Sequence, residues 1–257
     1  MSGAVKKVLV AREGAILIVT INRPDRRNAI DRETSLALAE AMDRLDADPD
    51  LSLAILTGAG EHFCAGMDLK AFVAGERVEL PGRGLAGITQ TPLAKPLIAA
   101  VEGYALAGGF EIALACDLIV ASETAQFGLP EAKRGLIAGS GGLVRLPERM
   151  PRQIAMECAL TGRMIPAAEA ERWGLINRLC APGKALETAR TLAAEIAQNA
   201  PMSLTASKEI IANAGRWAED DLWPRQNDIL ERVITSGDAT EGARAFAEKR
   251  APVWKGR

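Results

Sequence analysis

Two glutamates near the middle of the chain, Glu111 and Glu131, stand in surroundings that suit acid–base chemistry. Glu111 lies in Ile98–Ala121, where Glu102 and Asp117 are the only other charged residues. Glu131 follows an apolar run that contains glycine. Apolar surroundings raise the pKa of a carboxyl, and a nearby carboxylate raises one of the two further. One acid can then carry a proton while the other is ionised, provided the fold brings the two together.

Each glutamate also has a purely structural interpretation. Glu111 can favour the dipole at the first turn of a helix. Glu131 can occupy the start of a turn after Pro130. Taken singly, neither residue decides between chemistry and structure.

Two glycine-containing turns, Phe63–Asp68 and Leu106–Glu111, each lead into an expected helix. The first N–H groups of a helix have no partner within it, and glycine lets a ligand approach the backbone closely. The helix N-terminus also carries a partial positive charge. Two such turns facing each other would direct two N–H groups at one oxygen, which is the arrangement of an oxyanion hole. The alternative is that each glycine only lets a helix pack against a strand.

The sequence offers little for other kinds of site. No Gly-x-x-x-x-Gly-Lys-Ser/Thr motif occurs and Ala138–Gly142 does not match G-x-G-x-x-G, so a nucleotide site is not indicated. A thiol nucleophile would have to use Cys64 with His62, the only histidine, and no third group is positioned to orient them. One histidine and no C-x-x-C pair also argue against a zinc site.

The composition predicts a cytoplasmic globular protein. The 257 residues can form one large domain, or one domain with an appendage. Lys+Arg 31 against Asp+Glu 33 gives a net charge of −2, so no basic excess favours nucleic acid or an anionic membrane. The four cysteines have no paired spacing and are expected to be reduced. Met1–Val10 is too short and too charged for a signal peptide, and charges and glycines interrupt the apolar stretch after Ile98, so no membrane span is expected.

Strands are expected to alternate with helices up to about residue 180, with helices alone after that. A hairpin is expected from 5–10 and 15–21, and the second run is apolar at nearly every position, so both of its faces should be covered. Asp31 is expected to cap a helix. Further expectations are strands at 51–56, 96–101, 118–121 and 126–128, a flexible surface segment at 78–83, a loop at 103–109, and helices over 183–199, over 201–215, around Ile229, and from a capping box of Asp238 and Glu241.

Taken together, these residues resemble the enoyl-CoA hydratase/isomerase (crotonase) superfamily over almost the whole chain. The landmarks of the resemblance occur in order along the sequence. They are Asn22-Arg23-Pro24 through Asn28-Ala29, Phe63 through Leu69, Gly103 through Glu111, Phe127 through Glu131, Gly141-Gly142 with Arg145-Leu146, Thr161-Gly162-Arg163, Ala170 with Trp173 through Asn177, and Phe246 through Arg250.

The resemblance implies an α/β fold in which a spiral of repeated ββα units precedes a helical C-terminal region. That region builds trimers in the family, usually paired into hexamers. The implied division is a crotonase core with the active site at 1–195 and trimerisation helices at 196–257. A homotrimer or a homohexamer is therefore expected.

The resemblance also implies where the substrate binds. The backbone N–H groups of Met67 and Gly108 would form the oxyanion hole for the carbonyl of a coenzyme A thioester. Neither a metal nor a separate cofactor is implied, because CoA is part of the substrate. The residues expected to line the substrate and CoA are Arg27, Ala65, Met67, Asp68, Leu69, Lys70, Gly108, Phe246 and Lys249, the last two from their own or a neighbouring subunit.

The two glutamates distinguish among the reactions of the superfamily. Hydratases carry glutamates at both positions, isomerases generally keep one, and thioesterases or dehalogenases substitute other groups. The resemblance thus implies reversible hydration of a trans-2-enoyl-CoA to a 3-hydroxyacyl-CoA, an activity of fatty acid metabolism. Glu111 is assigned to water activation and Glu131 to proton transfer, although two coupled acids leave this division open.

Three stretches, 65–70, 129–133 and 254–257, are similar to the carnitinyl-CoA dehydratase branch. That branch runs the same chemistry on a charged acyl group and stays an alternative, as does an enoyl-CoA isomerase. Ala138 departs from the proline of many relatives, in the loop behind Glu131 that shapes the acyl pocket. A non-catalytic, RNA-binding relative is a remote alternative, against which the acidic balance and the lack of a basic, aromatic stripe argue.

Overall fold

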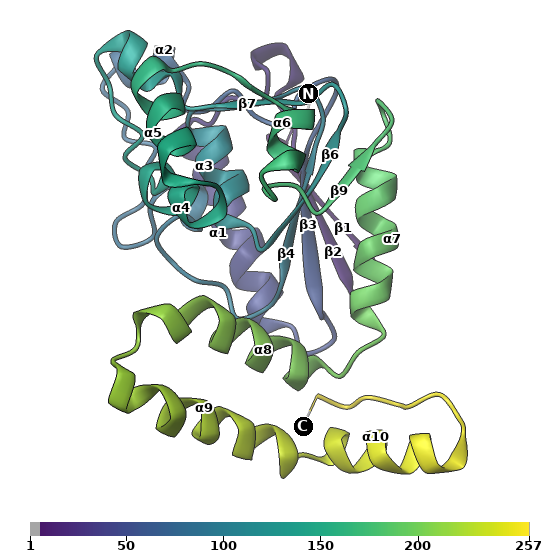
Figure 1. Ribbon diagram of the computed structural model, residues 1–257. Coiled ribbons are helices and arrows are strands. Elements are labelled where there is room, and N and C mark those ends of the chain that lie inside the picture. Colours follow the sequence, from purple (N-terminus) through teal and green to yellow (C-terminus); the bar gives the residue numbers. More distant parts are fainter. Residues whose placement is uncertain (1–5, 257) are drawn as a thin grey trace.

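The computed structural model describes residues 6–256, and a six-stranded sheet forms its centre (Figure 1). The strand order is β1-β2-β3-β4-β6-β9, in which β1 and β2 form an antiparallel hairpin and every later pair is parallel. A smaller sheet has the order β5-β7-β8. The strands are β1 (Val8–Glu13), β2 (Ile16–Ile21), β3 (Leu53–Gly58), β4 (Leu97–Val101), β5 (Tyr104–Leu106), β6 (Leu118–Ser122), β7 (Gln126–Gly128), β8 (Ile165–Pro166) and β9 (Arg178–Cys180).

The helices connect these strands and then continue alone to the C-terminal end. They are α1 (Arg32–Ala47), α2 (Leu69–Val73), α3 (Gly108–Ala115), α4 (Gly142–Arg149), α5 (Arg152–Thr161), α6 (Ala167–Arg172), α7 (Ala185–Ala197), α8 (Pro201–Asn213), α9 (Glu219–Ile234) and α10 (Gly237–Glu248). Short 3-10 turns occupy Pro24–Arg26, Leu85–Gly87, Pro130–Arg134 and Ala214–Arg216.

Helices cover both faces of the large sheet, which is why its strands are apolar at consecutive positions. In β2, Leu17 and Val19 join the larger core cluster, together with Leu38 and Met42 of α1. Their neighbours Ile16 and Ile18 point the other way and form a second cluster with the buried alanines of α7. The expectation that this strand is buried on both faces is confirmed.

In Figure 1 the last three helices lie below the sheet, with α9 and α10 beneath α8. α8 contacts the region where β6 begins, since Lys208 Nζ donates to Asp117 Oδ2 at 2.7 Å. The chain after α10 folds back, and Trp254 Nε1 donates to Gln198 O at 2.7 Å, just past the end of α7. The division predicted between 195 and 196 falls in the last turn of α7. None of the described helices is both long and apolar enough to span a bilayer.

Most of the predicted elements are present. The hairpin is confirmed for its described part, while Val5 lies outside the described residues. The strands predicted at 51–56, 96–101, 118–121 and 126–128 correspond to β3, β4, β6 and β7. Asp31 does cap α1, since its side chain accepts a hydrogen bond from Thr34 N at 2.9 Å.

Three local predictions are wrong. The segment 78–83 is not a loose surface stretch, because Val78 and Leu80 are buried and Leu80 pairs with Gly84. The expected loop at 103–109 contains β5, which is too short to show a pattern in the sequence. The cap of α10 is Ser236, whose hydroxyl accepts from Ala239 N, rather than Asp238. The Asp238 carboxylate instead accepts the N–H groups of the C-terminal segment.

Candidate active site

The two glycine turns identified in the sequence meet in the structure. Cys64 N donates to Tyr104 O at 2.9 Å, and Leu106 N donates to Cys64 O at 3.0 Å, so the first turn pairs alongside β5. A Cβ atom built on Gly108 would lie 3.5 Å from Met67 N. Among the backbone hydrogen bonds of residues 6–256, neither the Met67 nor the Gly108 N–H has an acceptor. Two free N–H groups therefore lie side by side at the start of α3.

The residue before Gly108 is held in a strained conformation. Ala107 has φ 51° and ψ −130°, a combination that an L residue rarely adopts and that costs on the order of 1–3 kcal/mol. Its N–H donates to Gly128 O at 2.8 Å, which anchors it to β7. The strain lies at the peptide unit that carries the Gly108 N–H, so it fixes the direction of that donor.

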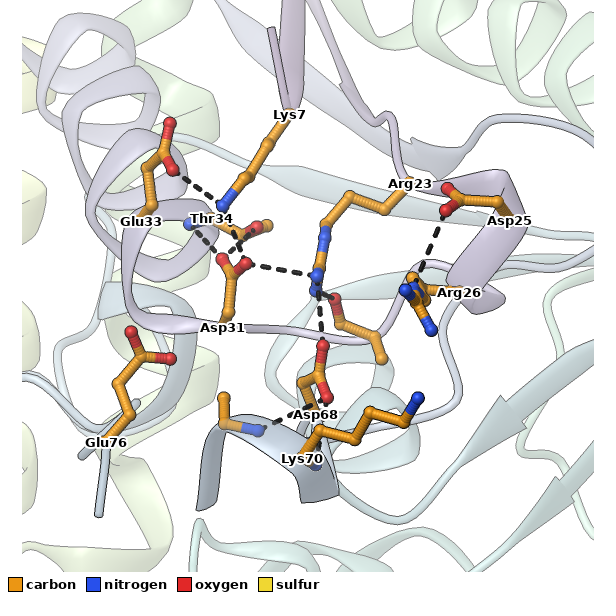
Figure 2. A network of polar contacts seen from close by, with 12 residues as sticks. Lys7, Arg23, Asp25, Arg26, Asp31, Glu33, Thr34, Asp68, Lys70 and Glu76 are labelled. Carbon is orange, nitrogen blue, oxygen red and sulfur yellow. Dashed lines mark hydrogen bonds and ion pairs between the residues drawn. The ribbon is translucent and has the colours of Figure 1, made fainter. Parts of the chain in front are cut away.

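The other donor, Met67, precedes a residue of a charged network, which Figure 2 shows. Arg23 Nη2 lies 2.9 Å from Asp68 Oδ2 and 3.1 Å from Asp31 Oδ2, and Arg23 Nη1 also donates to Ala29 O. Asp68 follows Met67 directly and caps α2 by accepting from Lys70 N. The arginine thus joins the start of α1 to the start of α2, with the Met67 turn between them.

The carboxyls of this network have pKa values below their usual range. Burial raises the pKa of Asp31, but hydrogen bonds from Lys7 and Thr34 outweigh it and bring the pKa to about 2. Burial acts the same way on Asp68, and the hydrogen bond from Arg23 lowers its pKa in net. Both carboxyls are therefore ionised partners of Arg23 at neutral pH.

Glu111 lies on the first turn of α3 and is 3% exposed. Its Oε1 accepts two backbone hydrogen bonds, from Ser140 N at 2.7 Å and from Gly142 N at 2.9 Å. Burial raises the pKa of Glu111 to about 7, helped by the charges of Glu131 and Glu79 and opposed by these two N–H groups. A carboxyl with such a pKa can give or take a proton near neutral pH.

Glu131 lies in the 3-10 turn that follows β7 and is 9% exposed. Burial raises its pKa. Its Oε2 atom is buried and has no hydrogen-bond partner within the described residues. Since its charge contributes to the raised pKa of Glu111, the fold brings the two acids within electrostatic reach of each other. An unpartnered buried carboxylate oxygen is a natural position for a ligand or a water molecule.

Gly108 and Glu111 share the first turn of α3, so one short helix holds an N–H donor and an acid in fixed relation. Two N–H groups can stabilise negative charge that develops on a carbonyl oxygen. The two carboxyls can transfer protons at the carbon atoms beyond that carbonyl. The arrangement fits chemistry in which a carbonyl compound passes through an enolate-like form.

The remaining residues expected at the site are mostly exposed. Arg27, Leu69 and Lys70 lie at the surface, Ala65 is half-buried, and Arg27 lines a cavity of about 400 Å³ that also contains His62. Asp68 uses its carboxylate for Arg23 and the cap of α2. Phe246 and Lys249 stand at the end of α10, which Figure 1 places on the far side of α8 from α2 and α3.

The thiol interpretation has little support. Burial raises the pKa of Cys64 to about 12, so its sulfur is a thiol at neutral pH. The sulfur accepts a hydrogen bond from Gly66 N at 3.3 Å. The His62 ring stacks on Tyr104, with 4.5 Å between the ring centroids. Cys64 and His62 therefore have structural partners. In the part of the chain that the structure describes, no group of three His, Cys, Asp or Glu side chains is placed to hold a metal ion.

Ser140 and Glu79 lie near Glu111, and the sequence does not predict a role for either of them. Ser140 binds Glu111 through its backbone N–H and binds Glu79 Oε1 through its hydroxyl at 2.7 Å. Ser140 lies in the glycine-rich stretch Ala138–Gly142, where the family resemblance singles out Ala138 and two of the glycines but not the serine. Glu79 lies in the segment that was expected to be loose, and no local pattern marks either residue.

Comparisons with known proteins agree with this geometry. A model of the enoyl-CoA hydratase/isomerase family matches residues 11–257. Carnitinyl-CoA dehydratase from Salmonella typhi is 48% identical over 257 residues, covering 96% of this chain and 98% of the relative. The crystal structure of an enoyl-CoA hydratase from Mycobacterium marinum has a TM-score of 0.96 and 57% identity, covering 98% of this chain and 99% of the other. That of carnitinyl-CoA hydratase from Mycobacterium avium has a TM-score of 0.79 and 46% identity, with the same coverage. This chain therefore belongs to the enoyl-CoA hydratase/isomerase family and has the crotonase fold.

Proposed function

We propose that this protein catalyses the reversible addition of water to the C2=C3 double bond of a 2-enoyl-CoA, giving a 3-hydroxyacyl-CoA. The observation that carries the proposal is the pair of buried glutamates, Glu111 and Glu131, both with raised pKa values, beside two free backbone N–H groups. Family membership supplies the class of substrate, an acyl-CoA thioester.

The N–H groups of Met67 and Gly108 bind the thioester carbonyl. As water adds, a bond forms between the water oxygen and C3, and the electrons of the double bond move toward the carbonyl. The negative charge on the carbonyl oxygen is then stabilised by the two donors. The two fixed N–H dipoles stabilise the negative charge on the carbonyl oxygen, so this step does not require a metal ion.

The two carboxyls balance the protons of the reaction. An ionised carboxylate takes one proton from the attacking water, and a protonated carboxyl gives one proton to C2. Glu111 is fixed through Oε1 by two N–H groups, and Glu131 has an unpartnered Oε2. We assign Glu111 to water activation and Glu131 to the proton at C2, with the pair titrating as a coupled unit.

A second candidate is the same chemistry on a charged acyl group, the dehydration of carnitinyl-CoA. The names of the curated Salmonella relatives favour it over a plain fatty enoyl-CoA. The mycobacterial structures carry both kinds of name. The two candidates share every step at C2 and C3 and differ only in what the acyl pocket accepts. An isomerase would move the double bond of a 3-enoyl-CoA without adding water.

The test is turnover of crotonyl-CoA, carnitinyl-CoA and a 3-enoyl-CoA by the wild-type protein, followed by enoyl absorbance and product analysis. Glu111→Gln and Glu131→Gln should each lower kcat by roughly 10²–10⁴-fold, the range for positioned acid–base groups. Glu40→Gln, on the exposed side of α1, is the matched control and should leave the rate unchanged. Unimpaired activity in both glutamate variants would refute the assignment.

The ratio of kcat/KM for carnitinyl-CoA and 3-hydroxybutyryl-CoA decides between the two candidates.

We also propose that the protein assembles as a homotrimer or a dimer of trimers. Large apolar side chains of the last helices are exposed, among them Ile211 at 81%, Trp223 at 64% and Phe246 at 88%. Burying such side chains against a second copy would remove apolar surface from water. Light scattering of the eluting protein would measure the mass directly, and a monomer would refute this proposal. Cytoplasmic localisation stays a prediction.

A further inference from the structure

Glu79 is a third acid that approaches the acid pair, from the segment between α2 and the 3-10 turn at Leu85–Gly87. Its neighbours Val78 and Leu80 are buried, while Glu79 itself is exposed. The segment is held in place, since Leu80 N donates to Gly84 O at 3.0 Å and Gly84 N donates to Leu80 O at 2.9 Å. Glu79 Oε1 accepts the Ser140 hydroxyl at 2.7 Å, across 61 positions of sequence.

Ser140 links this outer acid to an inner one. It is buried, and its backbone N–H donates to Glu111 Oε1 at 2.7 Å. The residues around it, Gly139, Gly141 and Gly142, have no side chains that could hold the loop in place. The Ser140 hydroxyl is thus the side chain in this stretch that ties the loop to another segment, and Glu79 is its acceptor.

We propose that Glu79 is a positioning residue for catalysis, which acts through Ser140 to hold the 140–142 loop against Glu111 and adds a fixed negative charge near the acid pair. This inference rests on the proposed hydration reaction for its kinetic consequences. The contact of Ser140 with Glu79 and Glu111 does not depend on which substrate the protein binds.

The charge of Glu79 acts together with two other charged groups near Glu111. Glu131 comes from the turn after β7, and Arg145 comes from α4. Glu79 raises the pKa of Glu111, in the same direction as Glu131. Neutralising Glu79 should therefore lower the pKa of Glu111 and shift the acidic limb of the pH–rate profile to lower pH.

The kinetic experiment uses five variants, one of which is a control. Glu79→Ala and Ser140→Ala should each lower kcat by roughly ten- to hundredfold, with little change in KM, because Glu111 is displaced rather than removed. The double variant should be no worse than either single one, because both break the same bond. Glu79→Gln keeps an acceptor for the hydroxyl, so it should restore most of kcat while the acidic limb stays shifted. Glu76→Ala, on the same segment, is the matched control and should behave as wild type, since the Glu76 carboxylate faces Arg32 N instead.

A direct titration keeps this inference separate from the proposed reaction. Carbon-13 NMR of carboxyl-labelled glutamate, with the Glu111 signal assigned from Glu111→Gln, gives the titration of Glu111 without any substrate. A downward shift in Glu79→Gln supports the inference even if no enoyl-CoA is turned over. An unchanged Glu111 titration in Glu79→Gln, or wild-type kcat in Glu79→Ala, overturns it.

Discussion

Gly142 and Glu111 are packed so closely that position 142 has no room for a side chain. Gly142 N donates to Glu111 Oε1 at 2.9 Å. A Cβ atom at Gly142 would lie 2.9 Å from Glu111 Cγ and 3.1 Å from its Oε1. The glycine therefore both binds the carboxylate and leaves the space that the carboxylate occupies.

Replacing this glycine should displace the acid. In Gly142→Ala the new methyl group meets the Glu111 side chain, so Glu111 must move and lose its hydrogen bond. We expect kcat for enoyl-CoA hydration to fall roughly 10²-fold, because misplacement by about 1 Å can cost that much. Gly139→Ala is the control, since a Cβ there would meet only Ile137 O at 3.9 Å. Equal activity of the two variants would contradict a role for the Gly142 contact.

A methyl group at position 66 should push apart the two turns that carry the Met67 and Gly108 N–H donors. A Cβ at Gly66 would lie 2.9 Å from Ala107 Cβ and 3.0 Å from Gly108 N. Gly66→Ala should force the Met67 and Gly108 donors apart and lower kcat by roughly 10²–10³-fold, the usual cost of losing one oxyanion donor.

The control for Gly66→Ala is Gly75→Ala. Gly66 has φ +96° and Gly75 has φ +84°, so alanine is strained at both, but a Cβ at Gly75 would meet open space. Steady-state kinetics of both variants separate the strain from the contact. A similar loss of activity in the two would show that backbone strain alone explains the effect.

The Arg23 network predicts a large stability difference between two neighbouring arginines. Arg23 is 14% exposed and faces the nearly buried carboxylates of Asp31 and Asp68. Arg23→Gln therefore removes the cation paired with Asp68 and one of the two cations paired with Asp31, which keeps Lys7 at 2.7 Å. We expect the free energy of unfolding to fall by roughly 2–4 kcal/mol. Arg26→Gln breaks only an exposed pair with Asp25 and should cost about 0–0.5 kcal/mol. Urea denaturation of both variants measures the difference, and equal midpoints would refute the role of the network.

Elements with a regular apolar pattern were predictable from the sequence. The run 15–21 is apolar except for Thr20 because α1 and α7 cover the two faces of β2, and Asp31 directly precedes α1 and caps it. β5 and β9 have three residues each, too few to show a period, and form because they pair with β7 and β6. Asp238 and Ser236 are both residue types that cap helices well. A tertiary contact decides between them, since the Asp238 carboxylate binds the backbone near the C-terminal end.

In the candidate site too, residues marked by local features could be predicted, and residues that depend on long-range contacts could not. Glycines before two helices and acids in apolar surroundings are local features, so the two turns and Glu111 could be singled out directly, whereas the resemblance to the family named Met67 and Gly108 as the donors. Glu79 could not, because its role depends on a hydrogen bond to Ser140 from a distant segment. Its flanking residues Val78 and Leu80 alternate with polar ones in a stretch too short to distinguish a packed segment from a loose one.

The raised pKa of Glu111 makes the contribution of this residue to the stability of the protein fall with rising pH. The pKa is about 7 in the folded protein against 4.5 ordinarily, so between these values the folded state binds more protons than the unfolded state. Stability contributed by the neutral acid is complete below pH 4.5 and is lost as pH rises to about 7. The free energy of unfolding of Glu111→Gln, minus that of wild type, should therefore grow by about 3 kcal/mol from pH 4.5 to pH 8, at 1.36 kcal/mol per pKa unit.

Glu187→Gln is the control with a pKa shift of the opposite sign, because the hydrogen bond from Lys184 lowers the pKa of Glu187. Replacing the Glu187 carboxylate should not stabilise the protein at pH 8. Urea denaturation across this pH range checks the sign, and a difference that stays flat would refute the buried-acid description of Glu111.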